Sequence, residues 1–137
     1  MKAFELNNQN VEQSFQLCSE QSTYALLSAV PINASSEVIK ENLYEVLSGC
    51  YLEIRASYIT DQFKKSSLVK VYELKRLVNP IDFTLYFHWI YQNEFSKVDG
   101  KRVFFDQLTV KLISRFDQVT EVGLQLFYED NGLVKLV

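Results

Sequence analysis

The chain has 137 residues, the usual size of a single domain, and apolar residues make up 47% of it, which excludes an intrinsically disordered chain. The formal net charge of −3 argues against a nucleic-acid partner, because such a partner selects a basic surface. Ten Phe, eight Tyr and one Trp stand against four Gly and two Pro. Since aromatic residues favour pleated sheets, we predict one sheet-rich domain spanning residues 1–137.

Nothing in the sequence marks a targeting segment or a membrane span. The longest apolar stretch near the N-terminus, residues 24–32, is too short to cross a bilayer, and no basic segment precedes it. Cys18 and Cys50 form no metal-ligand pattern, and two thiols suit a reducing compartment. We therefore predict a cytoplasmic protein without a membrane partner.

The first third of the chain predicts a polar arm, a strand and a helix. Residues 7–23 are rich in Asn, Gln and Ser and predict a loop or short irregular arm, and residues 24–32 predict a buried strand. Residues 37–47 predict an amphipathic helix that Ser35 or Ser36 caps. The apolar side chains of this helix share one face and are Ile39, Leu43, Val46 and Leu47.

The middle of the chain predicts a series of strands. Apolar and polar residues alternate over residues 52–58, and residues 68–74 fit the second arm of a hairpin. Residues 81–91 carry large apolar groups at six consecutive odd positions. This pattern favours a strand whose odd positions belong to the core, with a helix as the alternative. Asp99-Gly100 then predicts a turn.

The C-terminal part continues the strand pattern over residues 108–112 and 122–128. Residues 130–132, Asp-Asn-Gly, predict a tight turn before a last apolar strand at residues 133–137. We expect this strand to pair inside the sheet, with a second copy or a longer chain as the alternatives. The predicted fold is α+β, with one principal amphipathic helix packed on a curved, mainly antiparallel sheet of about six or more strands.

The order of the first predicted elements resembles a known family. The predicted strand, the predicted helix and a following strand that contains Ile54-Arg55 resemble the N-terminal part of the condensation and CoA-dependent acyltransferase superfamily over residues 24–74. The resemblance implies a strand, a helix and a strand pair, followed in the family by the catalytic signature HHxxxDG. Because His88 is the single histidine of the chain, no catalytic residue is carried over. The resemblance therefore implies a catalytically incomplete half of such an enzyme.

No group of residues predicts catalysis or a cofactor. In a strand, His88 shares a face with Asp82, Thr84 and Tyr86 as a small polar cluster, but the simpler interpretation is a half-buried histidine bonded to the backbone or to a hydroxyl. The sequence contains no nucleophile–base pattern, no metal-ligand spacing and no Gly-rich phosphate loop. We expect no cofactor, no metal and no enzymatic activity.

Basic residues gather in the predicted hairpin around two aromatic residues. The basic residues are Lys64, Lys65, Lys70, Lys75 and Arg76, and the aromatic residues are Phe63 and Tyr72. Such a surface resembles those that stack single-stranded nucleic acid. Lysines on an edge strand also prevent aggregation, and the negative net charge favours that interpretation. We therefore predict no nucleic-acid partner.

The aromatic segment and the apolar C-terminus suggest binding to another protein. Both faces of the segment at residues 81–91 carry large groups, so something covers each face. We predict a non-catalytic interaction or adaptor domain that contacts another protein or a second copy through a sheet edge or an aromatic face. The alternatives are a domain that binds a small apolar ligand and a half of a condensation-type acyltransferase. The candidate contact residues are Tyr86, His88, Ile90, Leu133, Val134 and Leu136.

Overall fold

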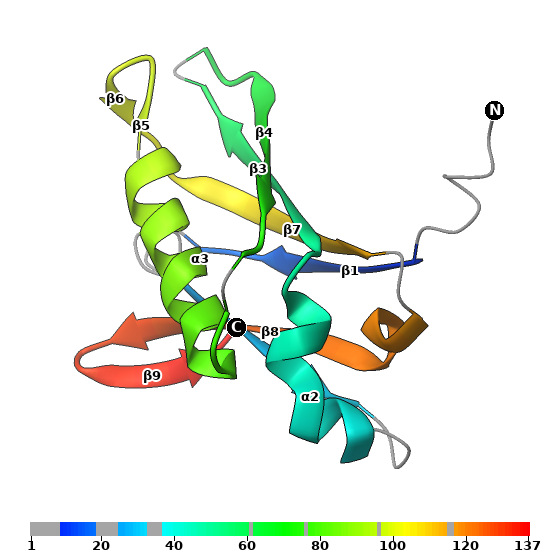
Figure 1. Cartoon of the computed structure of the whole chain (residues 1–137). Helices are drawn as coiled ribbons and strands as arrows, with labels where there is room; N and C mark the ends of the chain where they lie inside the picture. Colours follow the sequence, from blue (N-terminus) through cyan, green and yellow to red (C-terminus); the bar gives the residue numbers. More distant parts are fainter. Residues whose placement is uncertain are drawn as a thin grey trace, which may run out of the picture.

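The structure is a computed structural model. It describes residues 9–18, 25–32, 37–60, 62–75, 77–95, 97–114 and 117–137. The fold is α+β, and every strand pairing described is antiparallel, as expected (Figure 1). The expectation of one curved sheet of six or more strands is wrong, because the strands form a four-stranded and a three-stranded sheet with a separate two-stranded hairpin.

The larger sheet has the strand order β1-β7-β3-β4. Its strands are β1 (Gln9–Gln16), β7 (Phe105–Ser114), β3 (Tyr51–Ile59) and β4 (Lys65–Glu73). The predicted hairpin of β3 and β4 is confirmed, and the alternation predicted for β3 and β7 places every second side chain in the core. The fully buried residues of these two strands are Leu52, Ile54, Ala56, Leu108, Val110 and Leu112.

Strand β1 occupies part of the segment for which we expected a loop or irregular arm. Val11 and Phe15 pack against the core, whereas Glu12 and Ser14 between them are exposed. The strand lies at the edge of the sheet, and one of its faces is exposed to solvent. Polar residues on that face do not prevent strand formation. The Ser14 hydroxyl also lies 2.9 Å from the Thr109 hydroxyl across the β1–β7 pair.

The smaller sheet has the order β2-β8-β9. Its strands are β2 (Leu26–Pro31), β8 (Val122–Asp130) and β9 (Leu133–Leu136), and a 3-10 turn, η3 (Asp117–Glu121), precedes β8. The predicted turn is confirmed, since Asn131 (φ 51°) and Gly132 (φ 82°) form a two-residue hairpin loop with positive φ at both positions. The last strand pairs with β8 inside the sheet, as we expected.

Helix α2 (Glu37–Leu47) confirms the helix predicted at residues 37–47. Leu43 and Leu47 are buried on its inner face. The chain leaves the helix through Gly49 (φ 91°), whose amide donates to the Leu74 carbonyl oxygen at 2.8 Å. The expected capping serines, Ser35 and Ser36, lie outside the described residues.

Helix α3 (Pro80–Glu94) replaces the strand that we predicted at residues 81–91, so that prediction is wrong. Asn79 caps the helix: its side chain accepts a hydrogen bond from the Asp82 amide at 3.2 Å, and the Asp82 carboxylate accepts one from the Asn79 amide at 3.2 Å. Pro80 occupies the first turn, where proline favours a helix. With 15 residues, α3 is longer than α2 with 11 and is the principal helix.

An aromatic cluster joins α3 to the larger sheet. Phe105 of β7 makes edge contacts with Tyr58 of β3 (ring centroids 6.0 Å apart), Tyr91 (6.2 Å) and Phe95 (6.1 Å). Phe87 stacks on Tyr91 at 6.0 Å. The inner side of α3 is therefore fixed in the core, and the helix also lies along β2.

Candidate functional site

An apolar row runs along the outer side of α3. Ile81, Leu85 and Trp89 are 64%, 59% and 54% exposed, and their spacing of four residues places them on one side of the helix. Val78, which precedes the helix, is 71% exposed. We call these four residues the α3 row.

The α3 row contains no charged residue. The acidic residues of the helix, Asp82 and Glu94, lie near its two ends and are engaged in the cap and in an ion pair. The inner side of α3 already fills the core, so folding does not require an apolar row on its outer side. Protein interfaces are depleted of charge at their centre and enriched in aromatic residues. The α3 row has both properties.

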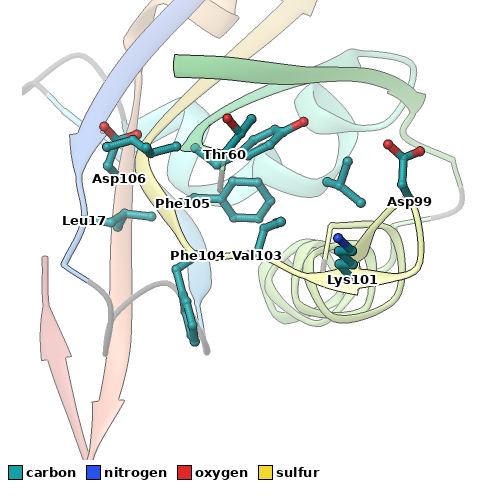
Figure 2. Close-up of a pocket in the computed structure, with 11 residues that line it drawn as sticks. Leu17, Thr60, Asp99, Lys101, Val103, Phe104, Phe105 and Asp106 are labelled. Atoms are coloured by element: carbon teal, nitrogen blue, oxygen red, sulfur yellow. The ribbon is translucent and has the colours of Figure 1, made fainter. Parts of the chain in front are cut away.

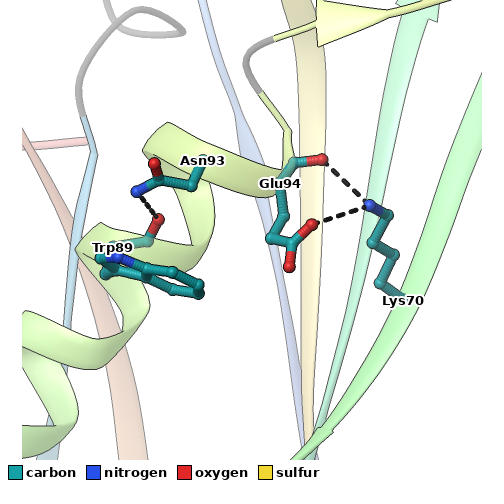
Figure 3. A network of polar contacts seen from close by, with 4 residues as sticks. All are labelled: Lys70, Trp89, Asn93 and Glu94. Carbon is teal, nitrogen blue, oxygen red and sulfur yellow. Dashed lines mark hydrogen bonds and ion pairs between the residues drawn. The ribbon is translucent and has the colours of Figure 1, made fainter.

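The C-terminal end of α3 is held by Lys70 of β4. The helix has no basic residue in its last turn, and the Lys70 ammonium occupies that position (Figure 3). Its Nζ lies 3.3 Å from Glu94 Oε2, donates to the Glu94 carbonyl oxygen at 3.2 Å, and lies 5.8 Å from the centre of the Phe95 ring. Asn93 Nδ2 donates to the Trp89 carbonyl oxygen at 2.8 Å in the same turn (Figure 3). Both helix ends are thus anchored, which holds the α3 row in one place.

The aromatic candidates predicted from sequence lie on α3 but not together. Ile90 is fully buried, Tyr86 is partly buried with its ring 6.5 Å from that of Tyr72, and His88 Nδ1 lies 3.3 Å from the Ala25 carbonyl oxygen. His88 thus has the backbone contact that we expected for a half-buried histidine. Residues two apart in the sequence share one face of a strand, but in a helix they point to different sides. Their role in partner binding stays a prediction.

The C-terminal candidates lie on an exposed edge strand. Leu133, Val134 and Leu136 of β9 are 64%, 60% and 58% exposed. Because consecutive residues of this strand are all exposed, both of its faces are uncovered. The β8–β9 hairpin extends away from the rest of the chain (Figure 1). These residues form a second apolar surface, which lies on a different element from the α3 row.

A cavity of about 680 Å³ opens at the opposite end of the molecule. It lies between the tip of the β3–β4 hairpin, represented by Thr60, and a small hairpin of β5 (Lys97–Val98) and β6 (Lys101–Arg102) (Figure 2). The turn predicted at Asp99-Gly100 joins these two strands and is confirmed. The cavity is open to solvent and lies beside the core.

Asp106 lines this cavity and lies at an irregularity in β7. Ser57 pairs with Gln107 and Tyr58 with Phe105, so Asp106 is the extra residue of a β-bulge. Its Oδ1 atom is buried and has no hydrogen-bond partner among the described residues. The bulge depends on pairing across the sheet, so no local pattern in the sequence predicts it.

Burial raises the pKa of two tyrosines and one cysteine among the described residues. Burial, followed by the charges of Glu94 and Tyr86, raises the pKa of Tyr72 to about 12, so its hydroxyl stays neutral at physiological pH. Burial also raises the pKa of Tyr91 and that of the Cys50 thiol. The described residues include no group of three or more His, Cys, Asp or Glu side chains placed to hold a metal ion. No helix in the described ranges has the length and hydrophobicity to cross a membrane.

Comparison of the chain with protein-family models, with curated proteins and with solved structures gives no match. Residues 24–74, for which the sequence predicted a resemblance to the acyltransferase superfamily, contain β2, α2, β3 and β4 in that order. No match tests this resemblance, which stays a hypothesis. Four residues that sequence reasoning did not select, Val78, Ile81, Leu85 and Trp89, form the α3 row, and their spacing of three or four residues is the signal that points to them once the segment is treated as helical.

Proposed function

We propose that the chain is a protein-interaction domain that docks through the α3 row. The partner that we propose is a second copy of the same chain. The observation that carries this proposal is a charge-free apolar outer side on a helix whose inner side already fills the core. The exposed parts of the four side chains offer roughly 500 Å² per copy, which makes them the centre of an interface that buries about 800 Å² on each partner.

The row is suited to pairing with itself. Ile81 and Trp89 lie one helical turn on either side of Leu85, so two antiparallel copies place Leu85 against its counterpart and Ile81 against Trp89 of the other copy. Antiparallel helices also oppose their dipoles favourably. Trp89 is a tryptophan, a residue type that is enriched at the hot spots of protein interfaces.

The edge of β9 is less suited to a second copy. The Val137 amide donates to the Leu126 carbonyl oxygen at 2.9 Å, so alternate residues of β9 direct their backbone toward β8, and Val134 and Leu136 direct theirs outward. Antiparallel pairing of two copies through these groups places Lys135 opposite Lys135 of the second copy. Like charges in that position are destabilising.

The test compares the solution mass of Leu85→Lys with that of the unmodified chain by light scattering over a concentration series. We expect the substitution to weaken self-association by about 2 kcal/mol, roughly 30-fold in dissociation constant, because it buries a charge at the centre of the interface. Val71→Lys is the matched control, since Val71 is 57% exposed on β4, away from the row. Equal association of both variants contradicts the proposal. A monomer at every concentration contradicts the second copy as partner.

Binding of a small apolar ligand is the second candidate function, and the cavity beside Thr60 favours it. The volume of about 680 Å³ falls within the range of ligand sites, and Val103 and Phe105 supply apolar walls. Saturable binding of a fluorescent apolar dye that Val103→Arg abolishes would support this candidate.

A further inference from the structure

Phe63, at the tip of the β3–β4 hairpin, has a conformation and an exposure that folding does not explain. Its side chain is 91% exposed, the highest value among the large apolar residues described. Its φ of 58° is unfavourable for a bulky residue, and glycine or asparagine adopts it at lower cost. Two backbone hydrogen bonds fix this turn, from the Phe63 amide to the Thr60 carbonyl oxygen (2.9 Å) and from the Thr60 amide to the Lys64 carbonyl oxygen (2.8 Å).

Exposed lysines lie on the same hairpin as Phe63 and on the hairpin that faces it across the cavity. Lys64 and Lys65 follow it directly, and Lys97 and Lys101 lie on the β5–β6 hairpin. The two hairpins face each other across the cavity, as Thr60 and Lys101 in Figure 2 show, and both tips point to the same end of the molecule in Figure 1. We call this region the hairpin end. Asp99, on the turn between β5 and β6, is also exposed and lines the cavity, but the four lysines outweigh it, so this end is basic although the whole chain carries a net charge of −3.

Further apolar surface lies beside these lysines. Ile59 is 58% exposed and Phe104 is 49% exposed, and both line the mouth of the cavity. Val98 and Val103 continue the apolar lining inward. An exposed aromatic side chain, aliphatic residues and four lysines on two hairpins therefore occur at one end of the fold.

We propose that the hairpin end binds the surface of an anionic lipid membrane. Phe63 enters the boundary between headgroups and acyl chains, and the four lysines lie against the anionic headgroups. Charge complementarity favours an anionic partner. The aliphatic residues Ile59 and Val98 favour acyl chains over nucleic-acid bases, because bases stack on aromatic side chains. The sequence predicts no membrane partner because it contains no spanning segment, but surface binding requires none.

The test is sedimentation of the full chain with vesicles of phosphatidylcholine alone and of phosphatidylcholine with 30% phosphatidylserine. We expect binding to the anionic vesicles only, with a decrease as salt is raised. Phe63→Ser is expected to weaken binding at least tenfold, because it removes the inserted aromatic ring. Lys64→Gln and Lys65→Gln are each expected to weaken it about fivefold. Phe63→Gly, which suits the positive φ better, gives a second variant in which loss of binding cannot come from misfolding.

Two controls separate this proposal from general charge effects and from docking through α3. Lys75→Gln removes an exposed lysine outside the hairpin end, and Leu85→Lys disrupts the α3 row, so both are expected to bind vesicles like the unmodified chain. Equal binding to neutral and anionic vesicles, or unchanged binding of Phe63→Ser and Phe63→Gly, overturns the proposal. So does binding of single-stranded oligonucleotides or of a soluble decanoate probe without any vesicle binding.

Discussion

The Tyr72 hydroxyl lies buried beside α3 without a hydrogen-bond partner among the described residues. The Tyr72 ring meets Tyr86 edge to face at 6.5 Å, so the side chain packs well even though its polar atom is unsatisfied. A buried polar atom without a partner costs stability, whereas the aromatic ring contributes it. Tyr72 is therefore a residue at which an apolar substitution improves the fold.

We predict that Tyr72→Phe raises the free energy of unfolding by about 0.5–1 kcal/mol, because it keeps the ring and removes the unsatisfied hydroxyl. Urea unfolding at neutral pH measures the change. Tyr44→Phe, at an exposed position on α2, is the control and is expected to leave stability unchanged. A loss of stability in Tyr72→Phe would show that the hydroxyl has a partner.

The same residue makes stability depend on alkaline pH. Burial and the neighbouring Glu94 raise the pKa of Tyr72 to about 12, above the value of about 10 in an unfolded chain. The folded state therefore holds the phenolic proton more tightly, and this contribution is complete below pH 10 and lost as pH rises toward 12. Unfolding measured at several pH values in this window is expected to show a shallower loss in Tyr72→Phe. Equal slopes would assign the loss to other tyrosines.

The two ends of α3 are stabilised by different devices. A local capping box of Asn79 and Asp82 starts the helix. Lys70, which is distant in sequence, places a positive charge at the C-terminal end of the helix and pairs with Glu94. The cap contributes through hydrogen bonds to amides that the helix leaves unpaired. Lys70 and Glu94 remain partly exposed, so solvent screens their pair and the packing of Lys70 over Phe95 adds to its effect.

We predict that Asn79→Ala lowers the free energy of unfolding by about 1 kcal/mol, since the Asp82 amide loses its acceptor. Thermal unfolding followed by circular dichroism is expected to show a decrease in Tm of about 4 °C. Asn93→Ala removes an exposed amide from the other end of the same helix and is expected to have less than half of this effect. Equal effects at the two ends would contradict the assigned role of the cap.

Sequence patterns predict the strands and helices that have one exposed face. They do not decide between a strand and a helix where the spacing of the apolar residues fits both. Residues 52–58 alternate strictly and form β3 as expected. Phe83, Phe87 and Tyr91 are four residues apart, and a spacing of four is compatible with a strand face and with a helix face alike. The deciding signal was the cap, Asn79-Pro80 followed by Asp82, which favours a helix start. Strand β1 was missed for another reason, because residues 7–23 are rich in Asn, Gln and Ser and this composition predicted a loop.

The division into two sheets and the candidate site were beyond local patterns. Strand β1 pairs with β7 and strand β2 with β8, and each pair joins segments about 100 residues apart, which no short window of sequence records. The pairing of β9 inside the sheet was expected from the Asp-Asn-Gly turn that precedes it. The α3 row was not, because Ile81, Leu85 and Trp89 share odd positions with the buried residues and were assigned to the core with them. Only the helix separates the two sets.

At the scale of the whole molecule, the proposed contacts lie on different parts of the fold. The α3 row is apolar and charge-free, whereas the hairpin end combines Phe63 with lysines. We propose a protein as the partner of the first surface and an anionic membrane as the partner of the second, and different elements supply the two surfaces.

The central claim, docking through the α3 row, is tested most directly by Trp89, the single tryptophan of the chain. It lies on the row and is 54% exposed, so its fluorescence reports the contact without a label. Acrylamide quenching measured from low to high protein concentration is expected to decrease by half or more, with a blue shift of the emission, as Trp89 becomes covered. Association of the chain with unchanged quenching and emission of Trp89 would show that another surface makes the contact, and would contradict the account.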